Sequence, residues 1–204
     1  MPRRTAPLAF ACLLAACAPD QPDSGEPTGE ATAEPANGAA SPAADLEPTN
    51  TTVGETNGRA HRFTSLANCP ITREERREMP FVERRCEGPG GYDLKITDSD
   101  ARNNLIVVAP DGTETSLNLS RIGNGGFSTL GDTAEWRSSD AASAPDSLVV
   151  RYQVAEQPHP APETSYLIAV RLTPTPCVVG QIAPGPGQNE SARAAADRPG
   201  PCLE

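Results

Sequence analysis

Few side chains in this 204-residue chain could act as a nucleophile, a base or a metal ligand. It contains two histidines, His61 and His159, and no GxSxG, SxxK or HExxH pattern. Those patterns matter because their spacing brings a nucleophile, base or ligand to one point in space. His159 lies between two prolines, which predicts a loop. We expect both histidine side chains to be exposed to solvent rather than catalytic. The sequence therefore predicts no catalytic residue.

Two short motifs resemble ligand-binding loops but depart from them at the decisive positions. Asp98-Ser99-Asp100 begins like a calcium loop, yet Arg102 and Asn103 follow where an oxygen ligand and a glycine are needed. The glycines around 123–131 suggest a nucleotide loop, but Ser128 replaces the third glycine of GxGxxG and no lysine follows. We expect turns at both places, with no metal and no cofactor.

The N-terminus carries an export signal. Arg3 and Arg4 precede an apolar run from Leu8 to Ala16, which is far shorter than the roughly 20 residues that cross a bilayer. The run ends at Leu14-Ala15-Ala16-Cys17, which resembles the lipobox of bacterial lipoproteins. The resemblance implies a signal peptide over residues 1–16, lipid on the Cys17 thiol and an acylated new amino terminus. Since Ala18 is not the aspartate that often retains such proteins, we expect the outer membrane, facing the periplasm.

Residues 17–58 have the composition of a disordered tether. From Ala18 to Gly58 there are six prolines, five glycines and eight acidic residues, and no lysine or arginine. Such a segment buries too little apolar surface to offset its ordering entropy. We therefore place one folded domain over residues 59–204. That region has 15 basic and 19 acidic residues, which makes nucleic acid an unfavourable partner.

Four cysteines remain for the domain after Cys12 leaves with the signal and Cys17 takes lipid. Four cysteines in an oxidising compartment predict two disulfides, with three possible connectivities. We favour the local pairs Cys69–Cys86 and Cys177–Cys202, because each pair brackets a compact unit with a plausible helix. Metal-ligand spacing of the CxxC or Cys/His kind is absent from the sequence.

The domain is predicted to be mainly β, an antiparallel β-sandwich or a small barrel-like sheet with two short peripheral helices. A capping-box spacing at Thr72 and Glu75, stopped by Pro80, predicts the first helix, and the alanine-rich stretch Asn189–Asp197 predicts the second. Alternating or continuous apolar residues, with a tight turn at Ala109–Gly112, predict these strands: Tyr92–Thr97, Leu105–Ala109, Thr113–Leu119, Thr133–Ser138, Leu148–Val154, Ser165–Leu172 and Cys177–Ile182.

A meander of the three strands over 133–172 predicts the register. Trp136 would face Tyr152, which would face Val170, on a side that packs into the core. The next column on that side would be Ala134, Val154 and Ile168.

The opposite side of the same register would bring three arginines into one row: Arg137, Arg151 and Arg171. Like charges in neighbouring positions of a sheet repel one another, so the three guanidinium groups need negative charge close to them. Either Glu135 neutralises part of the row, or the row binds phosphate or carboxylate groups through guanidinium forks.

These features predict a lipid-anchored protein of the cell envelope whose folded domain is a non-catalytic binding or structural module. Its partners would be the membrane, through the anchor, and an envelope protein or an anionic glycan. Two alternatives remain: an envelope hydrolase or modifying enzyme without a recognisable motif, and a periplasmic inhibitor of a hydrolase.

Overall fold

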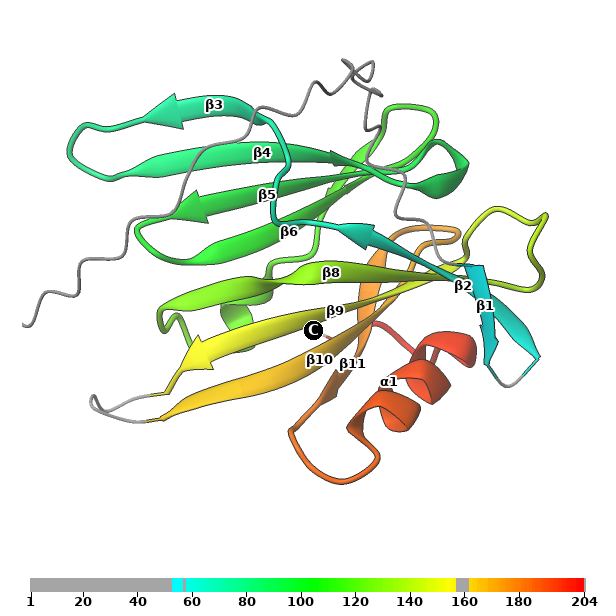
Figure 1. The fold of residues 1–204 in the computed structure, drawn as a ribbon. Helices are drawn as coiled ribbons and strands as arrows, with labels where there is room; N and C mark the ends of the chain where they lie inside the picture. Colours follow the sequence, from blue (N-terminus) through cyan, green and yellow to red (C-terminus); the bar gives the residue numbers. More distant parts are fainter. Residues whose placement is uncertain (1–52, 57, 157–161, 204) are drawn as a thin grey trace, which may run out of the picture. The chain divides into compact units, whose positions relative to one another are not determined.

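The computed structural model describes residues 53–56, 58–156 and 162–203 (Figure 1). The predicted signal peptide, Cys17, most of the predicted tether and His159 lie outside the described residues. The described chain forms two antiparallel sheets, one of six and one of five strands. The domain is therefore mainly β, as predicted.

The six-stranded sheet has the order β1-β2-β8-β9-β10-β11. Its strands are β1 (Val53–Thr56), β2 (Arg59–Ser65), β8 (Ser128–Ser138), β9 (Ser147–Ala155), β10 (Glu163–Arg171) and β11 (Cys177–Ile182). The five-stranded sheet follows chain order, with β3 (Ile71–Glu75), β4 (Phe81–Glu87), β5 (Asp93–Ser99), β6 (Asn103–Val108) and β7 (Glu114–Ser116).

One apolar core lies between the two sheets. The five-stranded sheet contributes Leu94 and Leu105, and the six-stranded sheet contributes Trp136 and Ile168, all at most 1% exposed. Each sheet ends in open edge strands, so neither closes among the described residues. This arrangement is consistent with the predicted sandwich, whereas the barrel-like alternative is not confirmed.

The two predicted peripheral helices have different outcomes. The structure contains α1 (Gln188–Asp197), which matches the prediction for Asn189–Asp197. The helix predicted between Thr72 and Pro80 is wrong, because β3 and β4 form a hairpin there. The capping-box spacing is a local signal, whereas pairing with β4 satisfies the backbone groups of β3 along a whole ladder.

The structure contains the two local disulfides, Cys69–Cys86 and Cys177–Cys202. The sequence predicts a helix between Cys69 and Cys86, but the first disulfide joins the two ends of the β3–β4 hairpin. The second joins the start of β11 to the segment after α1, and the N–H of Leu203 donates to the carbonyl of Val178 over 2.8 Å.

The register of the central strands differs from the predicted one. Trp136 lies opposite Leu148, Val150 lies between Ala134 and Ile168, and Tyr152 lies opposite Tyr166. Each strand is therefore offset by an even number of residues from the predicted pairing, which preserves the side of the sheet that each residue faces. Trp136 is 1% exposed and donates from Nε1 to Thr64 Oγ1 over 2.8 Å, so it is a core residue as predicted.

The folded part begins earlier than the boundary predicted at Arg59. Strand β1, which the sequence assigns to the tether, pairs with β2 from Val53↔Arg62 to Thr56↔Arg59. Backbone pairing with β2 defines this strand, and such pairing is not visible in composition. Among the described residues, no helix is long and apolar enough to cross a membrane.

Candidate functional site

The outer side of the six-stranded sheet, facing away from the shared core, carries the residues that concern function. Because side chains alternate along a strand, Leu148, Val150 and Tyr152 of β9 enter the core, while Val149 and Arg151 face outward. Outward-facing residues of β8 and β10 join them. This side therefore holds the three arginines for which the sequence leaves two interpretations, compensation by Glu135 or an anion site.

Helix α1 covers part of this side (Figure 1). Its buried residues Ala192 and Ala196 pack against Val149 and Leu167 of the sheet. The helix approaches closely because the residues at the contact are small: a Cβ placed on Gly180 would lie 3.1 Å from the Cβ of Ala195. The alanine-rich composition of α1 thus sets how near its polar side chains come to the sheet.

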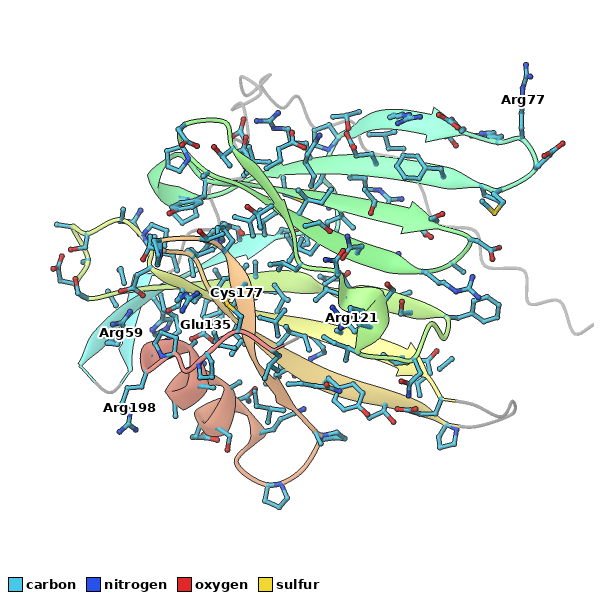
Figure 2. The ribbon with its side chains drawn as sticks, turned by 180° about the vertical axis from the view of Figure 1, so that it is seen from behind. Arg59, Arg77, Arg121, Glu135, Cys177 and Arg198 are labelled. Carbon is cyan, nitrogen blue, oxygen red and sulfur yellow. A yellow bond between two sulfur atoms is a disulfide. The ribbon has the colours of Figure 1, made fainter. Side chains whose placement is uncertain are left out.

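A buried ion cluster fastens the end of α1 to β8 and β2. The side chain of Arg137 is 0% exposed, and it donates from Nε and Nη2 to the two carboxylate oxygens of Asp197 over 2.6 and 2.7 Å. Its Nη1 donates to Glu135 over 2.7 Å. Arg193 Nε lies 2.9 Å from the same Glu135 oxygen, and Arg59 Nε lies 3.0 Å from Asp197. Figure 2 shows Arg59 and Glu135 close together at this end of the molecule.

The carboxylates of the ion cluster offset the charges of its arginines, and they raise the pKa of Arg137. Burial by itself lowers the pKa of Arg137, but hydrogen bonds from its guanidinium to Asp197 and Glu135 outweigh that effect and leave the pKa raised. A buried and fully engaged guanidinium is held as an ion. It has no free face to offer to an external anion.

A groove of about 300 Å³ opens beside the ion cluster, and we call it the sheet groove. Its floor and rim combine apolar and charged side chains. The lining residues are Phe63, Gly131, Asp132, Thr133, Glu135, Val149, Arg151, Leu167, Asn189 and Arg193. The groove therefore joins β2, β8, β9, β10 and the first turns of α1.

Arg151 is the arginine of the sheet groove that has no carboxylate partner among the described residues. Its Nη1 donates to Ser165 Oγ over 2.8 Å, and no carboxylate of the described chain pairs with it. The other arginine of the groove, Arg193, is paired with Glu135. A guanidinium has five N–H donors in a planar fork, so Arg151 can receive a carboxylate or phosphate oxygen while keeping Ser165.

Helix α1 adds to the positive character at the same end of the groove. Gly187 occupies the N-cap position and provides no side-chain cap, and Asn189 in the first turn lines the groove. The first N–H groups of a helix carry a partial positive charge. The groove also has two acidic lining residues, the exposed Asp132 and the buried Glu135, and the first turn of α1 carries Glu190.

The structure separates the three arginines of the predicted row. Arg137 and Arg171 both lie opposite Ser147, but Arg151 lies opposite Leu167, further along the strands. Arg137 is enclosed in the ion cluster, and Arg171 Nη2 contacts Cys202 Sγ at 3.1 Å. The row itself is not formed, and Arg151 is the member that remains available in a groove.

Sequence reasoning missed the partners that give the groove its shape. Arg193 and Asn189 come from α1, and Phe63 comes from β2, so only the packing of α1 and β2 on the sheet brings them to Arg151. Asp197 was also missed as the partner of Arg137. The only available signal was an acidic residue at the end of an alanine-rich helix.

The other residues that the sequence singled out have structural surroundings. His61 packs edge-on against Phe63 with ring centroids 5.3 Å apart. The segment with Asp98 and Asp100 is a tight hairpin turn, in which Asp100 and Ala101 have φ of 52° and 57° and Asp100 pairs with Arg102. In the part of the chain that the structure describes, no group of His, Cys, Asp and Glu could hold a metal ion.

Comparisons with protein-family models, with curated proteins and with solved structures found no match for this chain.

Proposed function

We propose that this chain is a lipoprotein of the bacterial cell envelope, anchored through Cys17 and exported to the outer membrane, with its domain in the periplasm. The support is the order of charge, apolar run and cysteine at the N-terminus, together with two disulfides, which are typical of an oxidising compartment. A fully acylated cysteine carries more than one chain, as stable anchoring requires. Cys17→Ser should release the protein from membranes or leave its precursor uncleaved, and unchanged membrane fractionation would contradict the anchor.

We further propose that the folded domain, a β-sandwich, is a non-catalytic binding module and that the sheet groove is its ligand surface. One observation carries this proposal: Arg151 lies in a groove of about 300 Å³ and has no carboxylate partner in the described part of the chain, whereas the neighbouring Arg193 has one. The ligand would offer a carboxylate or phosphate to Arg151 and an apolar portion to Phe63 and Leu167. An envelope protein or an anionic glycan has such groups.

The ion cluster supports this role by fixing the geometry of the groove. Arg193 and Asn189 reach the groove only while α1 stays docked, and Arg137 with Asp197 fastens the end of that helix. The groove is thus bounded by a strand that belongs to the sheet and a helix held to it by buried charges. Such preorganisation reduces the ordering cost of binding.

Binding to purified envelope components tests the groove. The full chain is incubated with peptidoglycan fragments, lipopolysaccharide and the membrane-protein fraction at low and high salt, and the bound fraction is measured for the wild type and Arg151→Gln. We expect the variant to bind roughly 10- to 150-fold more weakly and to lose part of the salt dependence, because one charge-assisted contact contributes roughly 1.5–3 kcal/mol.

Arg121→Gln is the matched control, because Arg121 is an exposed arginine on the 3-10 turn Leu119–Arg121 and does not line the groove. Equal binding of the Arg151→Gln and Arg121→Gln proteins would exclude the groove as the ligand surface.

A further inference from the structure

β3 is the edge strand of the five-stranded sheet, and the turn that joins it to β4 projects from the domain (Figure 1). We define the arm as residues 69–86, whose two ends are joined by the Cys69–Cys86 disulfide. Every residue from Ile71 to Pro80 is exposed, including Met79 at 69%. The arm tip therefore contributes nothing to the apolar core.

The tip of the arm presents arginine on a segment outside both strands. The β3–β4 ladder ends at the pair Glu75↔Phe81, and residues 77–79 are bends rather than hydrogen-bonded turns. Arg76 is held by Glu74 over 2.8 Å, whereas Arg77 forms no ion pair with the described chain. Figure 2 shows the Arg77 side chain extended away from the molecule.

Other exposed arginines lie in segments that are held in place. Arg73 and Arg85 belong to strands of the five-stranded sheet, and Arg121 is at the end of a 3-10 turn bonded to Asn118. Arg198 precedes Pro199, which has no N–H and restricts its neighbour. Residues 18–58 contain no lysine or arginine at all.

An endopeptidase must take several residues of its substrate as an extended segment, so it cuts exposed loop tips in preference to paired strands. From this geometry we infer that the bond between Arg77 and Glu78 is a processing site for an arginine-specific endopeptidase, one whose specificity pocket holds a carboxylate that receives the guanidinium. Water adds across the peptide bond, which leaves a carboxylate on Arg77 and an amino group on Glu78. This inference is independent of the sheet groove.

The Cys69–Cys86 disulfide gives the cut a defined product. Cys69 lies on the N-terminal side of the cut and Cys86 on the C-terminal side, so the two segments stay covalently joined. The β2–β8 ladder, from Ala60↔Ser138 to Ser65↔Thr133, also holds the N-terminal segment to the domain. The product is a two-chain protein that remains attached to its tether.

Limited proteolysis of the full chain with trypsin, as an arginine- and lysine-specific probe, tests the inference. We expect a first cut after Arg77, identified by mass spectrometry of the new termini. The product should migrate as one species without reductant and as two after reduction. Its circular dichroism spectrum and urea midpoint should stay close to those of the uncut protein.

Two variants at neighbouring positions identify the recognised side chain. Arg77→Gln should slow the cut after position 77 by at least about 100-fold, since a pocket built to bind a charged fork rejects a ligand without it. Arg76→Gln, in the same exposed tip, should leave the cut after Arg77 in place. A first cut at any bond other than Arg77–Glu78, an unchanged rate of cutting after position 77 in Arg77→Gln, or two separate species without reductant would each overturn the inference.

Discussion

The buried ion cluster gives the sharpest test of how α1 is held to the sheet. Replacing Asp197 with alanine removes both oxygens that accept from Arg137, at 2.6 and 2.7 Å, and leaves a guanidinium that is 0% exposed with its bond to Glu135. Breaking a buried pair by removing one partner costs about 3–5 kcal/mol. Since Glu135 still accepts from Arg137, we expect the lower part of that range, about 3 kcal/mol.

Urea unfolding followed by circular dichroism measures this loss. With an m-value of about 2 kcal/mol/M, a loss of about 3 kcal/mol lowers the urea midpoint by about 1.5 M. Arg198→Ala is the control, because Arg198 is the next residue, is exposed and points away from the domain in Figure 2. A surface change of that kind is expected to stay within about 0.5 kcal/mol.

A double variant separates the cost of an unpaired charge from the loss of packing. Arg137→Met combined with Asp197→Leu removes both charges and fills a similar volume, so it should be less destabilising than Asp197→Ala alone. Arg59 keeps Asp146 as a partner in that variant. A loss below about 1 kcal/mol for Asp197→Ala, or a double variant less stable than Asp197→Ala, would refute the reasoning.

Three further predictions concern the fold. Gly88→Ala should destabilise the domain by about 1–3 kcal/mol in urea unfolding, because a Cβ there would lie 2.5 Å from a buried indole ring, whereas Gly185→Ala, with nothing within 4 Å, should be neutral. Burial raises the pKa of Tyr152, so the stability that its neutral phenol contributes is present below pH 10.0 and is lost as the pH rises through the folded pKa. Tyr152→Phe should therefore reduce the loss of stability at alkaline pH, measured by unfolding at several pH values. An unchanged loss of stability at alkaline pH would contradict this prediction. Replacing Cys177 and Cys202 with serine should lower stability by about 3 kcal/mol in the same assay, and a midpoint equal to that of the wild type would exclude a stabilising role.

The sequence predicted most strands and α1 because their signals are local. Alternation of apolar residues marks β5, and the alanine-rich stretch before Pro199 marks the helix. The side of the sheet that Trp136 faces was also predictable, since an even offset in register leaves the side unchanged. The offset itself was not predictable, because it is set where each hairpin turns, after Arg137↔Ser147 and Ala155↔Glu163, and apolar alternation is the same for every even offset.

The parts that the sequence did not predict depend on distant contacts. β3 is a strand because it pairs with β4 beside the Cys69–Cys86 disulfide, while its own residues carry a helical capping signal. Arg137 looks like a surface residue in sequence, and only the docking of α1 brings Asp197 over it. The sheet groove exists for the same reason, so no single segment could have indicated it.

Site-specific photo-crosslinking in the native envelope tests most directly whether the sheet groove binds a partner. A photoreactive residue replaces Thr133, which is exposed and lines the groove, or Thr113, which is exposed on the hairpin of the other sheet. We predict a discrete adduct from position 133 that is absent from position 113 and is strongly reduced when Arg151→Gln is added. Equal adducts at both positions, or an adduct at 133 that Arg151→Gln leaves unchanged, would contradict the sheet groove as the binding surface.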